Sequence, residues 1–396
     1  MKWIVAHPDT QHSLHSARAL KAAGQLQFLF TSISLQRPEW LGPVLQSIHP
    51  TSHARLSQHR AHLGLSAEDI RVFPAHFLAA RLGSRVWGMS QATFGRRAGR
   101  LAIEEGAGVM AFNTNAVETF RLLRHAKLPG VLDQTIAHRR WSLRVGQAEC
   151  DAFPEWRDQW DAPDWRIALE DEELELADAI LCGSEFCANT LHQEGVPPSK
   201  LKVVHYGTDT QRFTPARDPR PAGFPVRLLF VGTLSLRKGP HYLLDAASRL
   251  RSLGIEVTLV GRSQLSADRL RSYSTFATHR THTLHGQMPE VYRQHDIYVF
   301  PSLVEGSSLS IYEALAAGLP VITTPNSGSI VRDQVEGLIV PPGDIEALTA
   351  AIERLVVNRD ERVAMGRAAR ARSESYGDWS HYQERLVKAL GQVAGP

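Results

Sequence analysis

Short apolar runs recur along the chain, and each is followed by small or polar residues and then by a stretch with helical spacing. The clearest runs span 3–6, 26–31, 226–231, 255–261 and 297–300. Runs of this length predict buried strands of a parallel sheet. The expected helices include 14–23, 116–125, 170–178 and 379–390. This alternation predicts the α/β class, and a length of 396 residues predicts two domains.

One strand-to-helix loop carries two glutamates. The run 297–300 predicts a strand and a short helix ends at Gly318, so Glu305 lies on the loop and Glu313 within the helix. Loops at the carboxyl ends of parallel strands bind ligands, and helix N-termini attract anions. Two carboxylates there suit sugar hydroxyls. A structural reading is also open, because Ser310 and Glu313 have capping-box spacing and Glu305 could be a solvated acid.

A second loop, residues 232–239, follows the strand at 226–231 and carries Arg237 and Lys238. A glycine-containing loop before a helix suits a phosphate group, and a cationic pair would neutralise a diphosphate. The alternative is a basic turn on the surface.

Composition excludes several classes of function. The net charge is +3. The chain has 43% hydrophobic and 21% charged residues, a composition that is ordinary for a soluble α/β protein. Three cysteines without metal-ligand spacing favour a reducing cytosol, and no zinc-ligand pattern occurs. We find no signal-peptide pattern and no run of membrane-spanning length. The first βαβ unit lacks G-x-G-x-x-G, and no basic motif with interleaved aromatics predicts nucleic-acid binding.

The charge is unevenly distributed. Residues 1–140 carry 17 Lys and Arg against 8 Asp and Glu, whereas residues 141–180 carry 3 against 12. A basic first segment suits an anionic lipid surface or a phosphorylated acceptor. A solvated surface balanced by the acidic segment is the alternative.

The motifs after residue 300 resemble those of the family 4 (group 1) retaining glycosyltransferases. Pro-Ser…Glu-Gly at 301–306, Glu-Ala-Leu-Ala-Ala-Gly at 313–318 and the following Pro-Val resemble that family's E-x7-E signature. The resemblance implies that Glu305 meets the donor sugar, Glu313 the ribose, and Lys238 with Arg237 the diphosphate. The other donor-binding positions that it implies are Gly232, Thr233, Gln287, Met288, Gly306, Ser307, Ser308 and Leu309.

Two positions depart from the family pattern. Ser307 and Ser308 stand where Phe-Gly or Phe-Pro is common, and Thr233 stands where an Arg is expected. These departures bear on the donor sugar more than on the fold.

The first half offers weaker candidates. Residues 128–138 resemble the family strand that ends in an active-site His, and here Asp133 precedes His138 by five residues. We take His138 as the equivalent catalytic residue and Asp133 as the second choice; a hydrogen-bonded core His is the alternative. In the first loop, Gln11, His12 and His15 could contact substrate, but we favour the interpretation that they are polar surface residues.

The resemblance implies the GT-B fold, in which two Rossmann-like domains with parallel sheets face a cleft. We expect an acceptor-side domain over 1–215, a linker within 213–225, a nucleotide-sugar domain over 224–375, and a helix at 379–390 that packs back on the first domain. The last helix therefore crosses between domains.

The implied function is metal-independent, retaining transfer of a sugar from a nucleotide sugar to a saccharide, lipid-linked or small-molecule acceptor. No cofactor or metal is expected, and the expected location is cytoplasmic, with peripheral contact with an anionic membrane. Two alternatives stay open at this point. One is a GT-B sugar-nucleotide epimerase, and the other is a non-catalytic nucleotide-sugar-binding protein.

Overall fold

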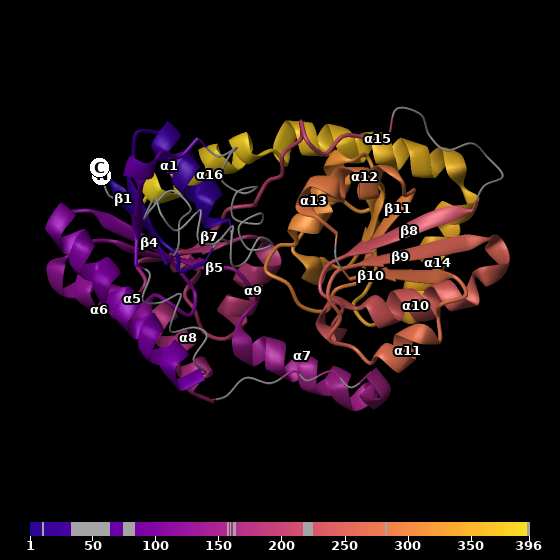
Figure 1. Cartoon of the computed structure of the whole chain (residues 1–396), viewed down its shortest axis with the longest axis horizontal. Helices are drawn as coiled ribbons and strands as arrows, with labels where there is room; N and C mark the ends of the chain where they lie inside the picture. Colours follow the sequence, from indigo (N-terminus) through magenta and orange to yellow (C-terminus); the bar gives the residue numbers. More distant parts are fainter. Residues whose placement is uncertain are drawn as a thin grey trace, which may run out of the picture.

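The chain forms two parallel sheets that lie side by side, each flanked by helices (Figure 1). The computed structural model describes residues 1–9, 12–32, 64–73, 84–156, 158, 160, 164–216, 225–281 and 283–393. The expected strands at 3–6, 26–31, 226–231 and 297–300 are confirmed at those residues.

The first sheet has seven strands in the order β3-β2-β1-β4-β5-β6-β7, all parallel. Its strands are β1 (Trp3–Ala6), β2 (Leu26–Thr31), β3 (Ile70–Val72), β4 (Gly108–Phe112), β5 (Gly130–Gln134), β6 (Ala179–Cys182) and β7 (Leu201–Val203). The helices of this half are α1 (Ser13–Ala22), α5 (Ser84–Glu105), α6 (Val117–Ala126), α7 (Arg139–Ala152), α8 (Asp164–Leu176) and α9 (Glu185–Gln193).

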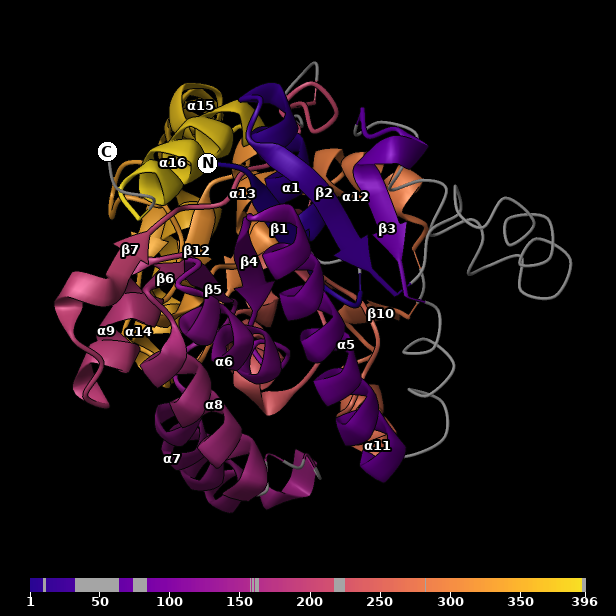
Figure 2. The ribbon, with the colours of Figure 1, turned by 90° about the vertical axis from the view of Figure 1, so that its left-hand side faces the viewer.

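Strand periodicity divides the first core into two layers. In β1, Trp3 and Val5 belong to the hydrophobic cluster that contains Leu14 and Leu20 of α1. Ile4 and Ala6 point to the opposite cluster, which contains residues of α5 and α6. Figure 2 shows α1 on one side of the sheet and α5, α6 and α8 on the other. Burial on both faces explains why these strands read as continuous apolar runs.

The second sheet has six parallel strands in the order β10-β9-β8-β11-β12-β13. They are β8 (Val226–Val231), β9 (Ile255–Val260), β10 (Ala277–Arg280), β11 (Ile297–Phe300), β12 (Val321–Thr323) and β13 (Gly337–Ile339). Its helices are α10 (Pro240–Arg249), α11 (Ala267–Arg271), α12 (Met288–Arg293), α13 (Leu309–Ala316), α14 (Ile345–Val357) and α15 (Arg359–Tyr376).

Both sheets reverse their strand order at one point. The reversal falls between β1 and β4 in the first sheet and between β8 and β11 in the second. In open α/β sheets, ligands bind beside the carboxyl ends of the strands at this switch. The fold therefore directs attention to the loops after β1, β8 and β11.

Two connections tie the halves together. Helix α7 runs along the lower edge of both halves in Figure 1, and α15 continues at the opposite edge into α16 (Trp379–Gly391). Helix α16 packs against α1, as expected for residues 379–390. The domain boundaries at 215, 224 and 375 stay predictions, and residues 217–224 of the expected linker lie outside the described residues.

Candidate functional site

Three charged side chains meet at the switch point of the second sheet. Glu305, on the loop after β11, places Oε1 2.8 Å from Nη1 of Arg237 and 3.0 Å from Nζ of Lys238. Glu305 is 8% exposed. Burial alone would raise its pKa, but the two cations outweigh burial and hold the pKa below the ordinary value. Glu305 is therefore an ionised carboxylate that acts as counter-ion to Arg237 and Lys238.

Short backbone contacts fix these two loops to each other. The amide of Leu303 donates to the carbonyl of Arg237 at 2.9 Å, and Nη1 of Arg237 donates to the carbonyl of Val304 at 2.6 Å. Gly239 has φ +72°, and a β-carbon there would lie 2.1 Å from the carbonyl oxygen of Pro301. The cations are thus held in place and half-buried, unlike those of a freely solvated basic turn.

Glu313 lies on α13 and contacts α12. The hydroxyl of Tyr292 donates to its Oε2 at 2.7 Å. Burial raises the pKa of Glu313 to about 7, although the Tyr292 hydrogen bond acts in the opposite direction. Helix α13 begins at Leu309 with Ser308 as its N-cap, so the capping box of Ser310 and Glu313 does not form. That structural alternative is wrong, because Glu313 lies in the second turn of the helix and bonds elsewhere.

The two serines that replace the family's Phe-containing pair bond to their own surroundings. The hydroxyl of Ser307 donates to the carbonyl of Gly328 at 2.9 Å, and the amide of Ser308 donates to the carbonyl of Ser327 at 3.2 Å. Both serines are buried, whereas Leu309 at the helix start is 37% exposed. Ser307 and Ser308 therefore hold the loop against its neighbour after β12.

The remaining donor-loop positions differ in exposure. Gly232 lies under Lys238, since a β-carbon at Gly232 would be 3.3 Å from Nζ of Lys238. Thr233 follows and is partly exposed. Gln287 is exposed before α12, but Met288 is a buried residue of the hydrophobic core. The structure therefore gives Met288 a packing role in addition to any backbone contact.

The first domain meets the Glu305 loop at Gly306. A β-carbon on Gly306 would lie 2.0 Å from the carbonyl oxygen of Thr135, so any side chain there would collide with backbone. The hydroxyl of Ser184 donates to the carbonyl of Gly306. Thr135 and Ser184 directly follow the strands β5 and β6, apart from one glycine. Neither residue was predicted from the sequence, although a position just after a buried strand was the available signal.

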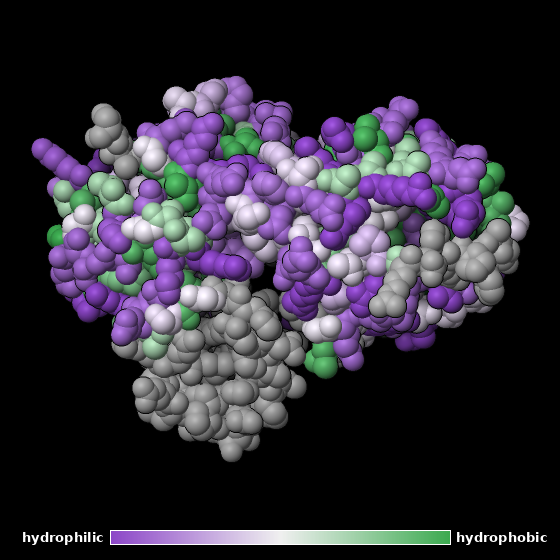
Figure 3. Space-filling view, turned by 90° about the horizontal axis from the view of Figure 1, so that it is seen from above, coloured by the Kyte–Doolittle hydropathy of each residue, from purple (hydrophilic) through white to green (hydrophobic). Residues whose placement is uncertain are grey.

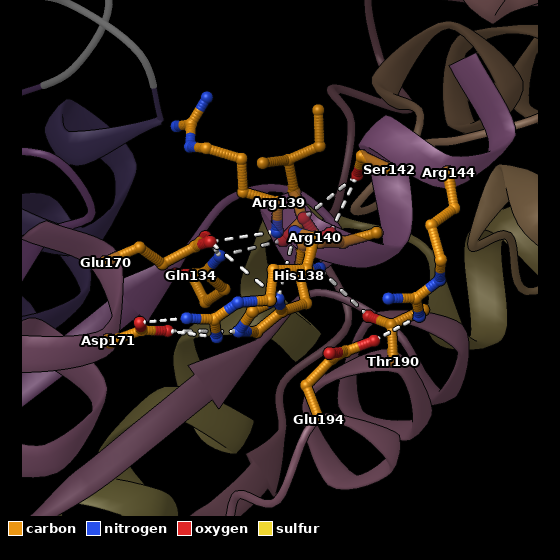
Figure 4. Close-up of polar contacts among 12 residues, drawn as sticks. Gln134, His138, Arg139, Arg140, Ser142, Arg144, Glu170, Asp171, Thr190 and Glu194 are labelled. Carbon is orange, nitrogen blue, oxygen red and sulfur yellow. Dashed lines mark hydrogen bonds and ion pairs between the residues drawn. The ribbon is translucent and has the colours of Figure 1, made fainter. Parts of the chain in front are cut away.

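The two first-domain candidates lie in different surroundings. His138 is the N-cap of α7, where its Nδ1 accepts the amide of Arg140 at 3.2 Å. Figure 4 shows His138 beside Glu170 and Asp171. Its Nδ1 lies 4.0 Å from Oε2 of Glu170, and its Nε2 lies 3.8 Å from Oδ1 of Asp171. Burial lowers the pKa of His138. These contacts are those of a buried capping residue and do not involve a substrate. The catalytic role of His138 therefore stays a prediction.

Asp133, near the end of β5, contacts the first loop instead. Its Oδ2 lies 2.9 Å from Nε2 of His12. His12 is 5% exposed, so the reading of His12 as a surface residue is wrong. His15 stacks on Trp379 with ring centroids 3.6 Å apart, and Gln11 lies outside the described residues. The structure thus pairs Asp133 with His12.

Two searches of the described residues give negative results. No group of three or more His, Cys, Asp or Glu there has the arrangement of a metal site. No described helix is both long and apolar enough to cross a bilayer.

The second half of the chain is similar to known proteins. Residues 225–358 match the family described as Glycosyl transferases group 1. The amylovoran biosynthesis glycosyltransferase AmsK of Erwinia amylovora is 30% identical over 216 residues, which cover 50% of this chain and 53% of AmsK. The chain thus spans about half the length of the curated relatives it matches.

Solved structures match almost the whole chain. Anabaena Alr3699/HepE in complex with UDP gives a TM-score of 0.67 at 14% identity and covers 99% of this chain and 100% of that one. Sucrose-phosphate synthase from Thermosynechococcus elongatus gives 0.71 at 18% identity and covers 99% of each chain. Residues 225–358 thus resemble the group 1 glycosyltransferases, and the whole chain has the GT-B fold.

Proposed function

We propose that the protein transfers a sugar from a nucleoside-diphosphate sugar to an acceptor hydroxyl, with retention at the anomeric carbon and without a metal ion. The observation that carries the proposal is the pairing of Glu305 with Arg237 and Lys238 at the switch point of the second sheet. A bound diphosphate would replace Glu305 as counter-ion of the two cations. The carboxylate of Glu305 is then free to accept hydrogen bonds from hydroxyl groups of the donor sugar.

The cations have a direct role in the chemistry. As the bond between the anomeric carbon and the diphosphate oxygen breaks, negative charge grows on the leaving diphosphate. Arg237 is already oriented by its hydrogen bond to the carbonyl of Val304, and with Lys238 it would stabilise that charge once the diphosphate has replaced Glu305. Two fixed positive charges can replace a divalent cation here, which is the reason for proposing metal independence.

Glu313 has the nucleotide role in this proposal. Its carboxyl group is oriented by the hydroxyl of Tyr292, which lies on α12, the helix that begins at the expected donor-binding residue Met288. A carboxylate accepts two ribose hydroxyls readily. With a pKa of about 7, Glu313 is substantially ionised above neutral pH.

The names of the relatives support a choice of donor and acceptor classes to test. The HepE structure contains UDP, and we therefore propose a UDP-sugar as the first donor to test. AmsK is named for amylovoran biosynthesis, which supports a saccharide acceptor, and an Escherichia coli relative named as a galactosyltransferase of GlcNAc-diphosphoundecaprenol supports a lipid-linked one. No observation favours the epimerase or the non-catalytic binding protein.

A membrane role, if the acceptor is lipid-linked, would be peripheral and electrostatic. The face seen in Figure 3 is mostly hydrophilic with separate small hydrophobic patches. Residues 1–140 carry the excess of basic residues, and each Lys or Arg near an anionic surface adds about 1 kcal/mol. Flotation with anionic liposomes at low and high salt tests this. Binding that fades with salt supports it, and a protein that stays soluble throughout favours a soluble acceptor.

The proposed function is tested by three measurements on the purified protein. Calorimetry with UDP measures nucleotide binding, and a panel of UDP-sugars with EDTA present measures metal-free donor turnover. NMR of the product gives its anomeric configuration. UDP binding and EDTA-resistant turnover with a retained configuration are expected. Strict Mg²⁺ dependence, an inverted product or an epimerised donor would each contradict the corresponding part.

A further inference from the structure

A short segment from the first half of the chain is embedded in the second domain. It begins in the last turn of α7, within the acidic region 141–180, and comprises residues 149–156 and Asp158, which we call the strap. The chain then returns to α8, which packs against α6 of the first domain. We propose that Asp158 is a positioning residue for the donor, because it caps the turn that carries Arg237 and Lys238. The inference rests on the proposed function, since it requires a diphosphate at that turn.

A buried tryptophan anchors the strap to the second domain. Trp156 is buried, and its ring stacks on that of Tyr273 with ring centroids 6.1 Å apart. The carbonyl of Trp156 accepts the amide of Ser266 at 2.9 Å, and the guanidinium of Arg269 lies 5.6 Å from the centroid of its ring. Figure 1 shows that α7 ends below α10 and α11 of the second domain. The strap therefore occupies a fixed place on that domain, although both helices that flank it belong to the first.

The end of the strap contacts the turn that carries the two cations. Leu236, Arg237 and Lys238 form one turn of 3-10 helix, whose N-cap residue is Ser235. The first amides of such a turn have no partner within it. The side chain of Ser235 makes no capping hydrogen bond, and the amide of Leu236 donates to Oδ2 of Asp158 at 2.6 Å. Asp158 thus provides the cap that Ser235 does not, from 78 residues away in the sequence.

The other side of the turn is held by the second domain itself. The carbonyl of Arg237 accepts the amide of Leu303 at 2.9 Å and the hydroxyl of Ser302 at 3.1 Å. With Asp158 in place, both ends of the turn are fixed while its two cations face the site. Leu236 is 0% exposed, so removal of the Asp158 carboxylate would leave a buried amide without this partner. The orientation of both cations therefore depends on a residue outside 225–358.

Asp158 would act on a bound diphosphate in two opposite ways. Its negative charge repels the diphosphate, so removal of the charge alone would strengthen nucleotide binding. Its hydrogen bond to Leu236 orients the turn before the diphosphate arrives, so removal of the bond would weaken nucleotide binding. The Leu236 amide is buried, whereas solvent screens the charge of the half-buried Asp158. We therefore expect the hydrogen bond to dominate, and the sign of the change in affinity distinguishes a cap from a nearby charge.

Calorimetry with UDP on two variants of Asp158 tests the inference. Asp158→Ala loses the acceptor, and we expect UDP to bind about fivefold more weakly, the scale of a lost N-cap. With the best UDP-sugar of the panel, kcat should fall as well, because the same turn acts on the leaving diphosphate. Asp158→Asn keeps an acceptor oxygen without the charge, so its UDP affinity should be equal to or higher than that of wild type. Glu155→Ala removes an exposed charge from the strap and should leave UDP affinity and kcat unchanged.

A measurement on the unmodified protein covers the case of a poorly folded Asp158→Ala. If the strap strengthens UDP binding, then UDP must strengthen the attachment of the strap by the same factor. Saturating UDP should therefore slow amide hydrogen exchange in residues 149–156. Exchange in α6, which lies far from the second domain in Figure 1, should not change.

Three outcomes would overturn the inference. They are a UDP affinity of Asp158→Ala equal to that of wild type, an equal loss of affinity in Asp158→Asn, and exchange in the strap that UDP does not alter. A loss of stability in Asp158→Ala with normal UDP affinity falls under the first and would mean that the strap only supports the fold. A wild type that does not bind UDP would instead refute the proposed function, and the inference with it.

Discussion

Lys238 holds its ammonium nitrogen 3.0 Å from the carboxylate oxygen of Glu305, and Arg237 approaches the same oxygen at 2.8 Å. The free protein therefore has an internal anion where the proposed diphosphate would bind. This relationship makes the cations and the carboxylate separable by mutation, because they would have opposite effects on nucleotide affinity.

Removing Lys238 should damage the chemical step. Lys238→Ala removes one of the two positive charges beside the leaving diphosphate. We expect a loss of transition-state stabilisation of ~3 kcal/mol or more, measured from kcat/KM, which is the scale of a lost oxyanion donor. Arg249→Ala, an exposed arginine at the other end of α10 that pairs with Glu346, is the matched control and should leave kcat/KM unchanged. Wild-type kcat in Lys238→Ala would falsify the diphosphate role.

Removing the charge of Glu305 should have the opposite effect on binding. Glu305→Gln leaves Arg237 and Lys238 without their internal counter-ion, so UDP affinity should be equal to or higher than that of wild type. Turnover should fall, because the proposed contact with the donor sugar is lost. Calorimetry and steady-state kinetics on one preparation measure both. A UDP affinity weakened as strongly as in Lys238→Ala would contradict this assignment.

Glu313 should act on the nucleotide and on the pH dependence of stability. Glu313→Ala should weaken UDP binding by ~1–3 kcal/mol, the scale of charged hydrogen bonds. Burial raises the pKa of Glu313 from 4.5 to about 7, so between these values the folded state binds more protons than the unfolded state. Its carboxyl group then lowers stability as pH rises from 4.5 to 7.

Glu313→Gln isolates this pH effect. The variant cannot ionise, so its free energy of unfolding relative to wild type should rise with pH by at most about 1.4 kcal/mol per unit, and level off above pH 7. Urea unfolding at several pH values measures it. A pH-independent difference between the two proteins would show that Glu313 titrates normally.

The contacts of His138 and Asp133 allow mutations to distinguish their roles. His138 caps α7 through its Nδ1, and an Asn can provide the same cap. We therefore expect His138→Asn to keep the stability of wild type but to lose turnover, and His138→Ala to lose turnover and also ~1 kcal/mol of stability. Normal turnover in His138→Asn together with lost turnover in Asp133→Asn would show that His138 only caps the helix and that Asp133 is the catalytic residue.

Local pattern predicted the elements well where one run determines one element. Residues 226–231 and 297–300 are continuous apolar runs and form β8 and β11 without a shift. The positions of Lys238 and Glu305 could then be predicted, because each lies on the loop after such a strand at the switch point of the sheet. Parallel topology then brings them together whatever the residues between.

The first-domain site could not be read in the same way. Strand β5 ends at Gln134, and the side chain that faces the second domain depends on the path of the next four residues. The burial of His12 depends on Asp133, 121 residues away, and no local pattern records such a contact. Helix α5 was missed because its many arginines and glycines hide the apolar spacing.

The contact between α7 and α10 provides the last prediction. Glu149, buried on α7, accepts from the hydroxyl of Tyr242 at 3.1 Å and lies 2.6 Å from Nε2 of His241, which is fully buried. Glu149→Ala would remove this partner of His241, which lies three residues after Lys238 in the sequence. We expect a loss of ~1–3 kcal/mol in the free energy of unfolding, measured by urea denaturation.

Glu149→Gln keeps an acceptor for both groups and should lose less. Glu346→Ala, which removes the exposed ion pair between Glu346 of α14 and Arg249 of α10, should change stability by under ~1 kcal/mol. Because His241 lies in the first turn of the helix that follows Lys238, Glu149→Ala should also weaken UDP binding, and Glu346→Ala should not. Equal stability losses in Glu149→Ala and Glu346→Ala would mean that α7 merely rests on the second domain, and the start of α10 would then be held by its own domain alone.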